Sequence, residues 1–364
     1  MNRRMDRLAV LAVPTGIVLG AGLFLLLSIP ARAEPYIAVR TGYKCSQCHV
    51  NQTGGGKRTD FGLLYAMTRL PFTVLRSPTG SSSFDPNLNQ WVSLGANLRV
   101  VERLTLEHTS SLGETVPSSN VTDFAEANLY TEVKVVPEVV MLYVDQTLAP
   151  SSSNRELFGM LVDSGRRAYA KVGRMLLPYG FRIIDNDAFI RSRTAYNYSR
   201  SATGVELGWE PGPLALVGNL TDGDFSVVGS TVFRRFQVGG AFARNITHGD
   251  DSVVGAFGGV NLGRFTMLGE VDFITEGDVD QLATLAELNY LITQGFNFKF
   301  TYEVFDRNYD VSIDRDGQER YTLGVEPFIM QFVQVRAFYR INKFIPQNAA
   351  QNQDQAILEF HVFF

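Results

Sequence analysis

The sequence predicts an all-β protein: a transmembrane antiparallel β-barrel of about 16 strands, preceded by a small N-terminal segment. Three observations support this prediction. Apolar and polar residues alternate beyond about residue 88, short and long polar connections also alternate, and the chain ends on an apolar strand that closes with phenylalanine. The chain has 364 residues, and its one long apolar run lies at the N-terminus. Strands rather than helices are therefore expected to cross a membrane.

Residues 1–33 have the layout of a secretory signal peptide. Positively charged residues precede an almost wholly apolar run over residues 8–30, and Ala31-Arg32-Ala33 places small residues at the positions before a cleavage site. The alternative is an uncleaved anchor, because the run is long enough to span a bilayer. The proline and glycines within the run favour cleavage, so we expect an exported protein.

The only two cysteines of the chain, Cys45 and Cys48, precede His49 in a C-x-x-C-H motif. This spacing places both thiols on one helical turn, where they can form thioethers with haem, and the imidazole follows as proximal iron ligand. Two cysteines exclude a disulfide framework and a multi-cysteine zinc or iron–sulfur site. A thioredoxin-like site would need a βαβ pattern, which is absent, and a disulfide between the two cysteines is the other alternative. The motif predicts one haem c.

The haem segment, residues 34–80, is too short to form an ordinary self-standing core. We expect a short helix over residues 61–70, and we expect residues 81–87 to be a linker. Lys57 and Arg58 have two interpretations, as partners of the haem propionates or as a solvated charge pair. A segment of this size needs another part of the chain to shield its haem.

Strands are expected over residues 88–364. In residues 295–305 the aromatic and apolar side chains fall on one face and the polar ones on the other. A soluble sandwich shows the same alternation, so the connections decide: short turns and longer polar links, such as residues 178–202, follow one another as periplasmic turns and extracellular loops do in outer-membrane barrels. Sixteen strands give about 17 residues for each strand with its connection, which suits tilted spans of about ten residues.

The C-terminus indicates an outer-membrane barrel independently. Apolar residues occupy alternate positions up to the terminal residue: Ala356, Leu358, Phe360, Val362 and Phe364. This pattern resembles the sorting signal of outer-membrane barrels, and a soluble edge strand with such a face would invite aggregation.

A single haem c motif joined to such a barrel resembles the fused cytochrome–porins of iron-oxidising and metal-respiring bacteria. The layout matches over the whole mature chain, but only Cys45, Cys48, His49 and Phe364 match at the level of motifs. The resemblance implies electron transfer across the outer membrane, between extracellular iron or another donor or acceptor and periplasmic cytochromes, with Fe(II) oxidation at the haem as the activity it allows. We expect residues 34–80 to lie in or against the periplasmic mouth, surrounded by a barrel in contact with outer-membrane lipid.

The second axial ligand of the haem iron is open. His361 is the preferred candidate, because it shares a lumen-facing strand face with Glu359, and Met67 is the local sulfur candidate. His108 and an iron with an open or water-filled position are the alternatives.

Two other functions compete with electron transfer. One is a passive diffusion porin whose haem motif is vestigial or merely structural. The other, a soluble hydrolase, lacks a nucleophile–base constellation and a metal-spaced His/Asp set. A formal net charge of −4 gives no reason to expect a nucleic-acid partner.

Overall fold

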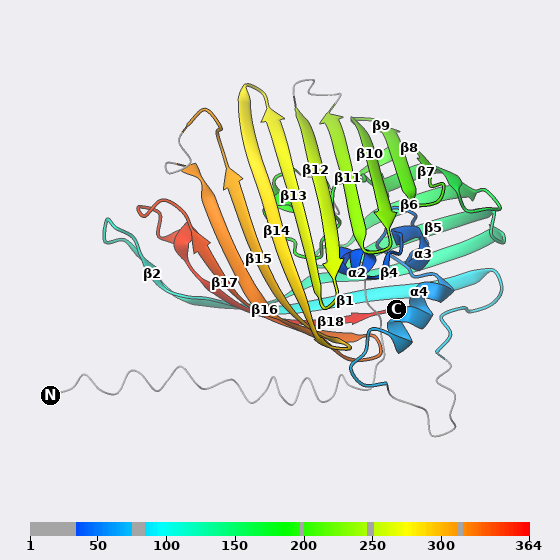
Figure 1. The fold of residues 1–364 in the computed structure, drawn as a ribbon, viewed down its shortest axis with the longest axis horizontal. Helices are drawn as coiled ribbons and strands as arrows, with labels where there is room; N and C mark the ends of the chain where they lie inside the picture. The colour runs from blue at the N-terminus through cyan, green and yellow to red at the C-terminus, as the bar shows by residue number, and fades with distance from the viewer. Residues whose placement is uncertain (1–33, 75–83, 195, 197–199, 246–250, 312–315) are drawn as a thin grey trace.

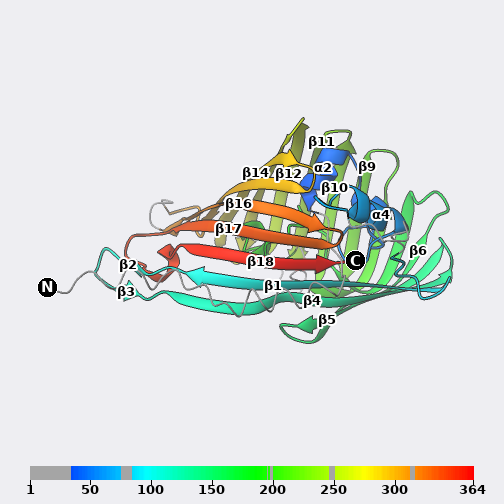
Figure 2. The same ribbon diagram turned by 90° about the horizontal axis from the view of Figure 1, so that it is seen from below.

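The computed structural model describes residues 34–74, 84–194, 196, 200–245, 251–311 and 316–364. Sixteen antiparallel strands form one closed barrel (Figures 1 and 2). They are β1 (Val92–Thr105), β4 (Ser119–Val136), β5 (Val140–Ala149), β6 (Ser153–Val162), β7 (Ala168–Leu176), β8 (Ser201–Trp209), β9 (Leu214–Thr221), β10 (Asp224–Phe233), β11 (Phe236–Asn245), β12 (Ser252–Leu262), β13 (Phe265–Glu276), β14 (Val279–Thr293), β15 (Phe296–Asp306), β16 (Gln318–Met330), β17 (Val333–Lys343) and β18 (Gln355–Phe363). The predicted fold class and strand number are confirmed.

Each strand pairs with its neighbour in sequence, and the first pairs with the last. β1 and β18 close the barrel in a register that joins Asn97 to Phe363 and Thr105 to Gln355. A short hairpin of β2 (His108–Thr109) and β3 (Thr115–Val116) lies outside this ring of strands. Closure leaves the barrel no unpaired edge.

The pleat of the strands separates apolar from polar side chains. On β13, Phe265, Met267 and Phe273 are exposed on the outer face, whereas Glu270 and Asp272 are buried on the inner face. The same separation confirms the two faces predicted for residues 295–305, where Asn297, Lys299 and Glu303 are buried. An apolar outer face and a polar inner face are what a barrel in a bilayer requires.

Helices are few. They are α2 (Pro35–Thr41), α3 (Cys45–Cys48), α4 (Asp60–Thr68), α5 (Phe189–Ser192) and the 3-10 turn η2 (Ala350–Asn352). The predicted helix over residues 61–70 corresponds to α4. Among the described residues, none of the helices has the length and apolar character to cross a membrane.

Two inserts fill the lumen: the N-terminal segment (residues 34–74) and the inner loop (residues 177–194). Their apolar side chains share one buried cluster with inward residues of the wall, with Tyr36 and Leu63 from the segment, Tyr179 and Phe181 from the loop, and Phe257 from β12. In Figure 1 the blue helices of the segment lie at the barrel end that also carries the C-terminus. The wall thus supplies the core that the segment is too short to build.

The inner loop corrects one expectation. Residues 178–202 were expected to form an extracellular loop, but the described part of this connection folds into the barrel. The reason is its own alternation, since Leu177, Tyr179, Phe181 and Ile183 are apolar and buried. Only inside the barrel can these side chains leave water.

Three sequence predictions lie wholly or partly outside the described residues. The signal peptide (1–33) lies outside them, as do residues 81–83 of the predicted linker and residues 75–80 of the haem segment. The remainder of the linker is ordered against the barrel, because the Phe84 ring packs against Phe332 and Phe364 at centroid distances of 5.2 and 5.1 Å. The first strand accordingly begins at Val92.

Candidate functional site

The C-x-x-C-H motif folds as one helical turn followed by an extended residue. Within α3, the backbone N–H of His49 donates to the Cys45 carbonyl over 2.9 Å. The backbone N–H of Thr59 donates to the Cys48 carbonyl over 3.0 Å, so the start of α4 lies directly on the motif. Both thiols are free, and the spacing places them on one turn as the sequence predicts.

A hollow with an empty volume of about 790 Å³ opens beside this motif inside the barrel, and we name it the haem cavity after the cofactor that the sequence predicts. Cys45, Cys48 and His49 all line it. The other lining residues come from α2, the adjacent loop, α4 and the inner loop, and they include Ile37, Tyr43, Gly54, Gly55, Tyr65, Leu70 and Phe181. His49 is 2% exposed. The mostly apolar lining with a few polar groups is typical of a site for a cofactor or ligand.

Glycines permit the close packing around the motif. Gly56 has a φ of +65°, and a Cβ there would lie 2.0 Å from the Tyr143 hydroxyl oxygen. At Gly62 on α4, a Cβ would lie 2.1 Å from the Cys48 carbonyl oxygen. A side chain at either position would push the motif away from its surroundings.

Positive side chains converge on the haem cavity. Arg58, Arg182 and Lys44 line it. The Arg182 guanidinium donates to the Gly54 carbonyl over 2.9 Å, and the Lys44 ammonium donates to the Leu214 carbonyl over 2.6 Å. Two thiols, an imidazole, an apolar hollow and three cations form the donor set that a c-type haem with two propionates requires, so the residues present fit this group.

The interpretation of Lys57 and Arg58 as a solvated charge pair is wrong. Lys57 is buried and pairs with Glu132 of β4, with 3.1 Å between the ammonium nitrogen and a carboxylate oxygen. Arg58 is buried as well, and its guanidinium carbon lies 5.2 Å from the centroid of the Phe363 ring. The barrel wall, which the local sequence does not reveal, excludes solvent from both.

The two thiols lack the electrostatics of a redox nucleophile. Cys45 is exposed as a residue, but partial desolvation of its thiol within the barrel, followed by the nearby Glu210 carboxylate, raises the thiol pKa to about 11. Burial also raises the pKa of Cys48. Thioredoxin-like cysteines need a lowered pKa, so this pair is poorly suited to dithiol–disulfide exchange.

Buried ion pairs hold the N-terminal segment to the wall. Glu34 forms ion pairs with Lys299 of β15 and Arg336 of β17, each at 3.4 Å. On the opposite side the Asn51 amide donates to the Glu156 carboxylate over 3.0 Å. Contacts with several strands around the barrel fix the segment as part of the barrel interior.

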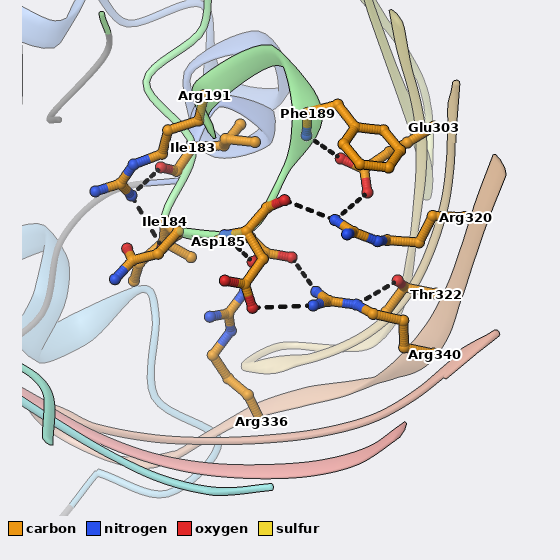
Figure 3. Close-up of polar contacts among 12 residues, drawn as sticks. Ile183, Ile184, Asp185, Phe189, Arg191, Glu303, Arg320, Thr322, Arg336 and Arg340 are labelled. Atoms are coloured by element: carbon orange, nitrogen blue, oxygen red, sulfur yellow. Dashed lines mark hydrogen bonds and ion pairs between the residues drawn. The ribbon is translucent and has the colours of Figure 1, made fainter. Parts of the chain in front are cut away.

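The inner loop is held by carboxylates and guanidiniums, and Figure 3 shows this contact. Arg340 pairs with both Asp185 and Asp187, at 3.2 Å for Asp187. The Phe189 backbone N–H donates to the Glu303 carboxylate over 3.1 Å. Burial raises the pKa of Asp185, but Arg340 and neighbouring arginines outweigh burial and hold this pKa well below its usual range.

The inner loop borders three hollows in succession. Gly180, Phe181 and Arg182 line the haem cavity. Residues 183–185 line a middle hollow of about 380 Å³. Residues 187–193 line the outer vestibule, an open hollow of about 960 Å³ at the end of the barrel where the longer connections lie. Asp187 follows Arg182 by five positions, so their Cα atoms are at most about 18 Å apart.

Neither predicted distal ligand lines the haem cavity. His361 faces the lumen as expected and is fully buried, but its ring nitrogens lie 3.0 Å from the Gln334 side-chain oxygen and 2.8 Å from that of Asn97. Met67 packs on α4 against the shared apolar cluster. His108 lies in the β2–β3 hairpin. The geometry therefore brings Cys45, Cys48 and His49 together without either distal candidate, and the distal ligand stays a prediction.

Sequence reasoning missed the inner loop and its arginine partners. Arg182 lines the haem cavity although it lies 133 residues beyond His49 in the sequence. The available signal was the apolar alternation from Leu177 to Ile183 within a connection that otherwise reads as polar. Among the described residues, no group of three or more His, Cys, Asp or Glu is placed to hold a metal ion.

No protein-family model matches the sequence, and no curated protein matches it. Solved structures do resemble the fold. The outer-membrane protein OmpT of Vibrio cholerae matches with a TM-score of 0.56 at 11% identity, over 75% of this chain and 97% of its own. An anion-selective porin from Comamonas acidovorans matches with a TM-score of 0.56 at 10% identity, over 75% and 99%. The channel DcaP of Acinetobacter baumannii matches with a TM-score of 0.54 at 9% identity, over 78% and 100%. The chain therefore has the barrel fold of outer-membrane porins.

Proposed function

We propose that the chain is an outer-membrane c-type cytochrome–porin fusion, which carries electrons between the cell exterior and periplasmic cytochromes through one haem c. Cys45 and Cys48 would hold the haem covalently, and His49 would be its proximal iron ligand. The observation that carries this proposal is that these three residues line one cavity inside a closed barrel. Bound haem supplies a one-electron couple, which a bilayer core about 30 Å thick otherwise lacks.

The chain's own residues have distinct tasks in this proposal. The single turn of α3 presents both thiols to the same side of the cavity, and the β4 and β5 wall encloses the adjacent loop. Arg58 and Arg182 offer positive charge for two propionates. The inner loop lies between the cavity and the outer vestibule, so it limits water and small molecules that enter from the exterior.

The proposed sidedness follows from the barrel. In outer-membrane barrels the short turns face the periplasm. The N-terminal segment contacts the short-turn end, because the Phe72 N–H donates to the Phe328 carbonyl over 2.6 Å and the Gln294 amide donates to the Thr68 carbonyl over 3.2 Å. A periplasmic cytochrome would thus meet the haem segment, and an extracellular donor or acceptor such as iron would approach from the outer vestibule.

Covalent haem in the purified outer-membrane fraction tests the proposal. The full chain is expressed with a c-type haem maturation system, and peroxidase staining and the alkaline pyridine spectrum are expected to give one covalent haem per chain. Cys45→Ser/Cys48→Ser should carry no covalent haem while its barrel keeps heat-modifiable electrophoretic mobility. A folded wild-type barrel without covalent haem contradicts the proposal.

A passive diffusion porin with a vestigial haem motif is the alternative, and the likeness of the barrel to solved porins favours it. The filled lumen argues against a wide pore, because residues of both inserts occupy the shared core cluster. Liposome swelling in small sugars separates the two functions. A cytochrome–porin fusion with a filled lumen should swell slowly. A diffusion porin should swell as fast as a general porin, and its swelling rate should be unchanged in Cys45→Ser/Cys48→Ser.

A further inference from the structure

The haem cavity holds one imidazole, that of His49, and neither predicted distal candidate lines it. A haem iron with two axial ligands needs a second donor that has a free lone pair, such as an imidazole, a thioether, a phenolate or a neutral amine. Outside the C-x-x-C-H motif, the lining side chains that carry an amine or a phenol are those of Tyr43, Lys44 and Tyr65. These three are therefore the side chains to consider first.

The Lys44 amine is already engaged at the barrel wall. Its ammonium donates to the Glu210 carbonyl over 3.1 Å and to the Leu214 carbonyl over 2.6 Å, and it forms an ion pair with the Glu210 carboxylate at 3.7 Å. An ammonium that is held in this way has no lone pair to give to iron.

The two phenols are poor ligands near neutral pH. A tyrosine must lose its proton before it binds iron, and its ordinary pKa is about 10. Burial raises the pKa of Tyr65 to about 12. The Tyr43 ring packs edge-on against the rings of Phe61 and Tyr65, at centroid distances of 5.2 and 6.1 Å. Outside the motif, the side chains of the described lining residues thus offer no ready second donor.

Glu34 adds a donor that is not a side chain. This residue lines the haem cavity and is 2% exposed. Cleavage at the expected site, between Ala33 and Glu34, would make Glu34 the first residue of the exported chain and give it a free α-amino group. An α-amino group ordinarily has a pKa of about 7.7–8.0, against about 10.4 for lysine, so its lone pair is far more available near neutral pH.

The position of Glu34 is fixed by its neighbours. Its carbonyl accepts from the Ile37 backbone N–H over 3.0 Å, and its carboxylate forms ion pairs with Lys299 and Arg336, each at 3.4 Å. Pro35 restricts the residue before it to an extended backbone, and Glu34 is extended with a ψ of 146°. Chain ends are poorly ordered unless they are tied down. An α-amino group on this residue is therefore held at the cavity wall.

We propose that the α-amino nitrogen of Glu34, freed by removal of the signal peptide, is the distal ligand of the haem iron. This proposal rests on the proposed function, because it requires the covalent haem. Hydrolysis of the Ala33–Glu34 peptide bond consumes one water and leaves the amine. The neutral amine then donates its lone pair to iron, and the oxidation state of iron does not change. Export and haem ligation are thereby linked, since the second ligand exists only after cleavage.

Spectroscopy and mass spectrometry of the purified, haem-loaded wild type give the first test. The intact mass is expected to be that of a chain that starts at Glu34 and carries one covalent haem. The ferric protein should show a low-spin electron paramagnetic resonance spectrum. Its near-infrared magnetic circular dichroism should show the charge-transfer band of imidazole–amine coordination, which differs from the bands of imidazole–imidazole and imidazole–thioether coordination.

Insertion of one serine between Ala33 and Glu34 gives the second test. It displaces the α-amino group by about 3.5 Å and keeps the small residues at the cleavage site. The variant should carry covalent haem at the wild-type ratio but convert most of its ferric haem from low-spin to high-spin, and added imidazole should restore the low-spin spectrum. One serine inserted after Gly113, in the exposed β2–β3 hairpin, is the matched control and should keep the wild-type spectrum.

Four results overturn the proposal. They are a wild-type chain that starts elsewhere than at Glu34, a high-spin wild type, an unchanged spectrum in the serine insertion before Glu34, and loss of the low-spin spectrum in Met67→Ala or His361→Ala. Where the insertion prevents folding, the near-infrared band of the wild type decides, because imidazole–imidazole or imidazole–thioether coordination excludes the amine. Absence of covalent haem from the wild type contradicts the proposed function instead, so the two failures are distinguishable.

Discussion

The N-terminal segment and the inner loop occupy the same lumen but are held there differently. The segment is fixed by buried ion pairs, such as Lys57 with Glu132 and Glu34 with Lys299. The inner loop is fixed by backbone N–H groups on wall carboxylates and by ion pairs that open to the outer vestibule, where the Asp187 side chain is 37% exposed. The segment is therefore a permanent part of the core. The loop separates the hollows of the lumen, and its contacts with the wall depend on solution conditions such as pH.

The largest expected effect comes from breaking a buried pair of the segment. Glu132→Gln leaves the Lys57 ammonium buried without its carboxylate, which typically costs about 3–5 kcal/mol. We expect the segment to become accessible to protease while the barrel stays folded, measured by limited proteolysis of the purified protein. The double variant Lys57→Met/Glu132→Gln removes both charges and should restore most of the protection.

A segment equally resistant to protease in Glu132→Gln would show that this ion pair does not hold it. Conversely, clean release of the N-terminal segment from the wild-type barrel would contradict its place in the core altogether.

A smaller effect is expected from the contact between α4 and the haem motif. Gly62→Ala places a methyl group against the Cys48 carbonyl, and such overpacking costs about 1–3 kcal/mol. The ratio of covalent haem to protein should fall in this variant, because α3 can no longer keep its position beside the cavity. Leu64→Ala, at an exposed position of the same helix, is the control and should keep the full ratio.

The smallest effect concerns the inner loop and pH. Arg340 holds the pKa of Asp185 below its usual range, so this ion pair stabilises the loop above a pH of about 3.9 and is lost as the pH falls further. Conductance in planar bilayers should rise on acidification below that value. Asp185→Asn should show a raised conductance at neutral pH and a weaker response to acid; the same acid response in both proteins would exclude Asp185 as its origin.

The sequence predicted the parts of the fold that depend on local pattern. Alternation along strands such as β15, the order of short and long connections and the terminal Phe364 were sufficient for a barrel of 16 strands. The C-x-x-C-H spacing was sufficient to place Cys45 and Cys48 on one turn.

The parts that depend on contacts across the barrel could not be predicted. The partners of Lys57 and Arg58 lie on strands 75 or more residues away in the sequence. The local pattern therefore indicates that Lys57 and Arg58 are solvated. The sequence predicts an extracellular link in place of the inner loop, because polar residues such as Asp185 interrupt the apolar alternation. These polar residues pair with charged residues of the wall, as Asp185 does with Arg340. Only closure of the barrel brings such pairs together.

Electron transfer through the barrel is the central claim, and proteoliposomes test it most directly. The haem-loaded protein is reconstituted into vesicles that enclose a reduced small soluble cytochrome, and a membrane-impermeant ferric chelate is added outside. The wild type is expected to oxidise the enclosed cytochrome, monitored optically, and Cys45→Ser/Cys48→Ser in vesicles of equal tightness is expected not to. Equal oxidation rates in the two preparations would contradict electron transfer through the haem. Absence of electron transfer by a fully haem-loaded wild type, with the redox gradient tested in both directions, would contradict it as well.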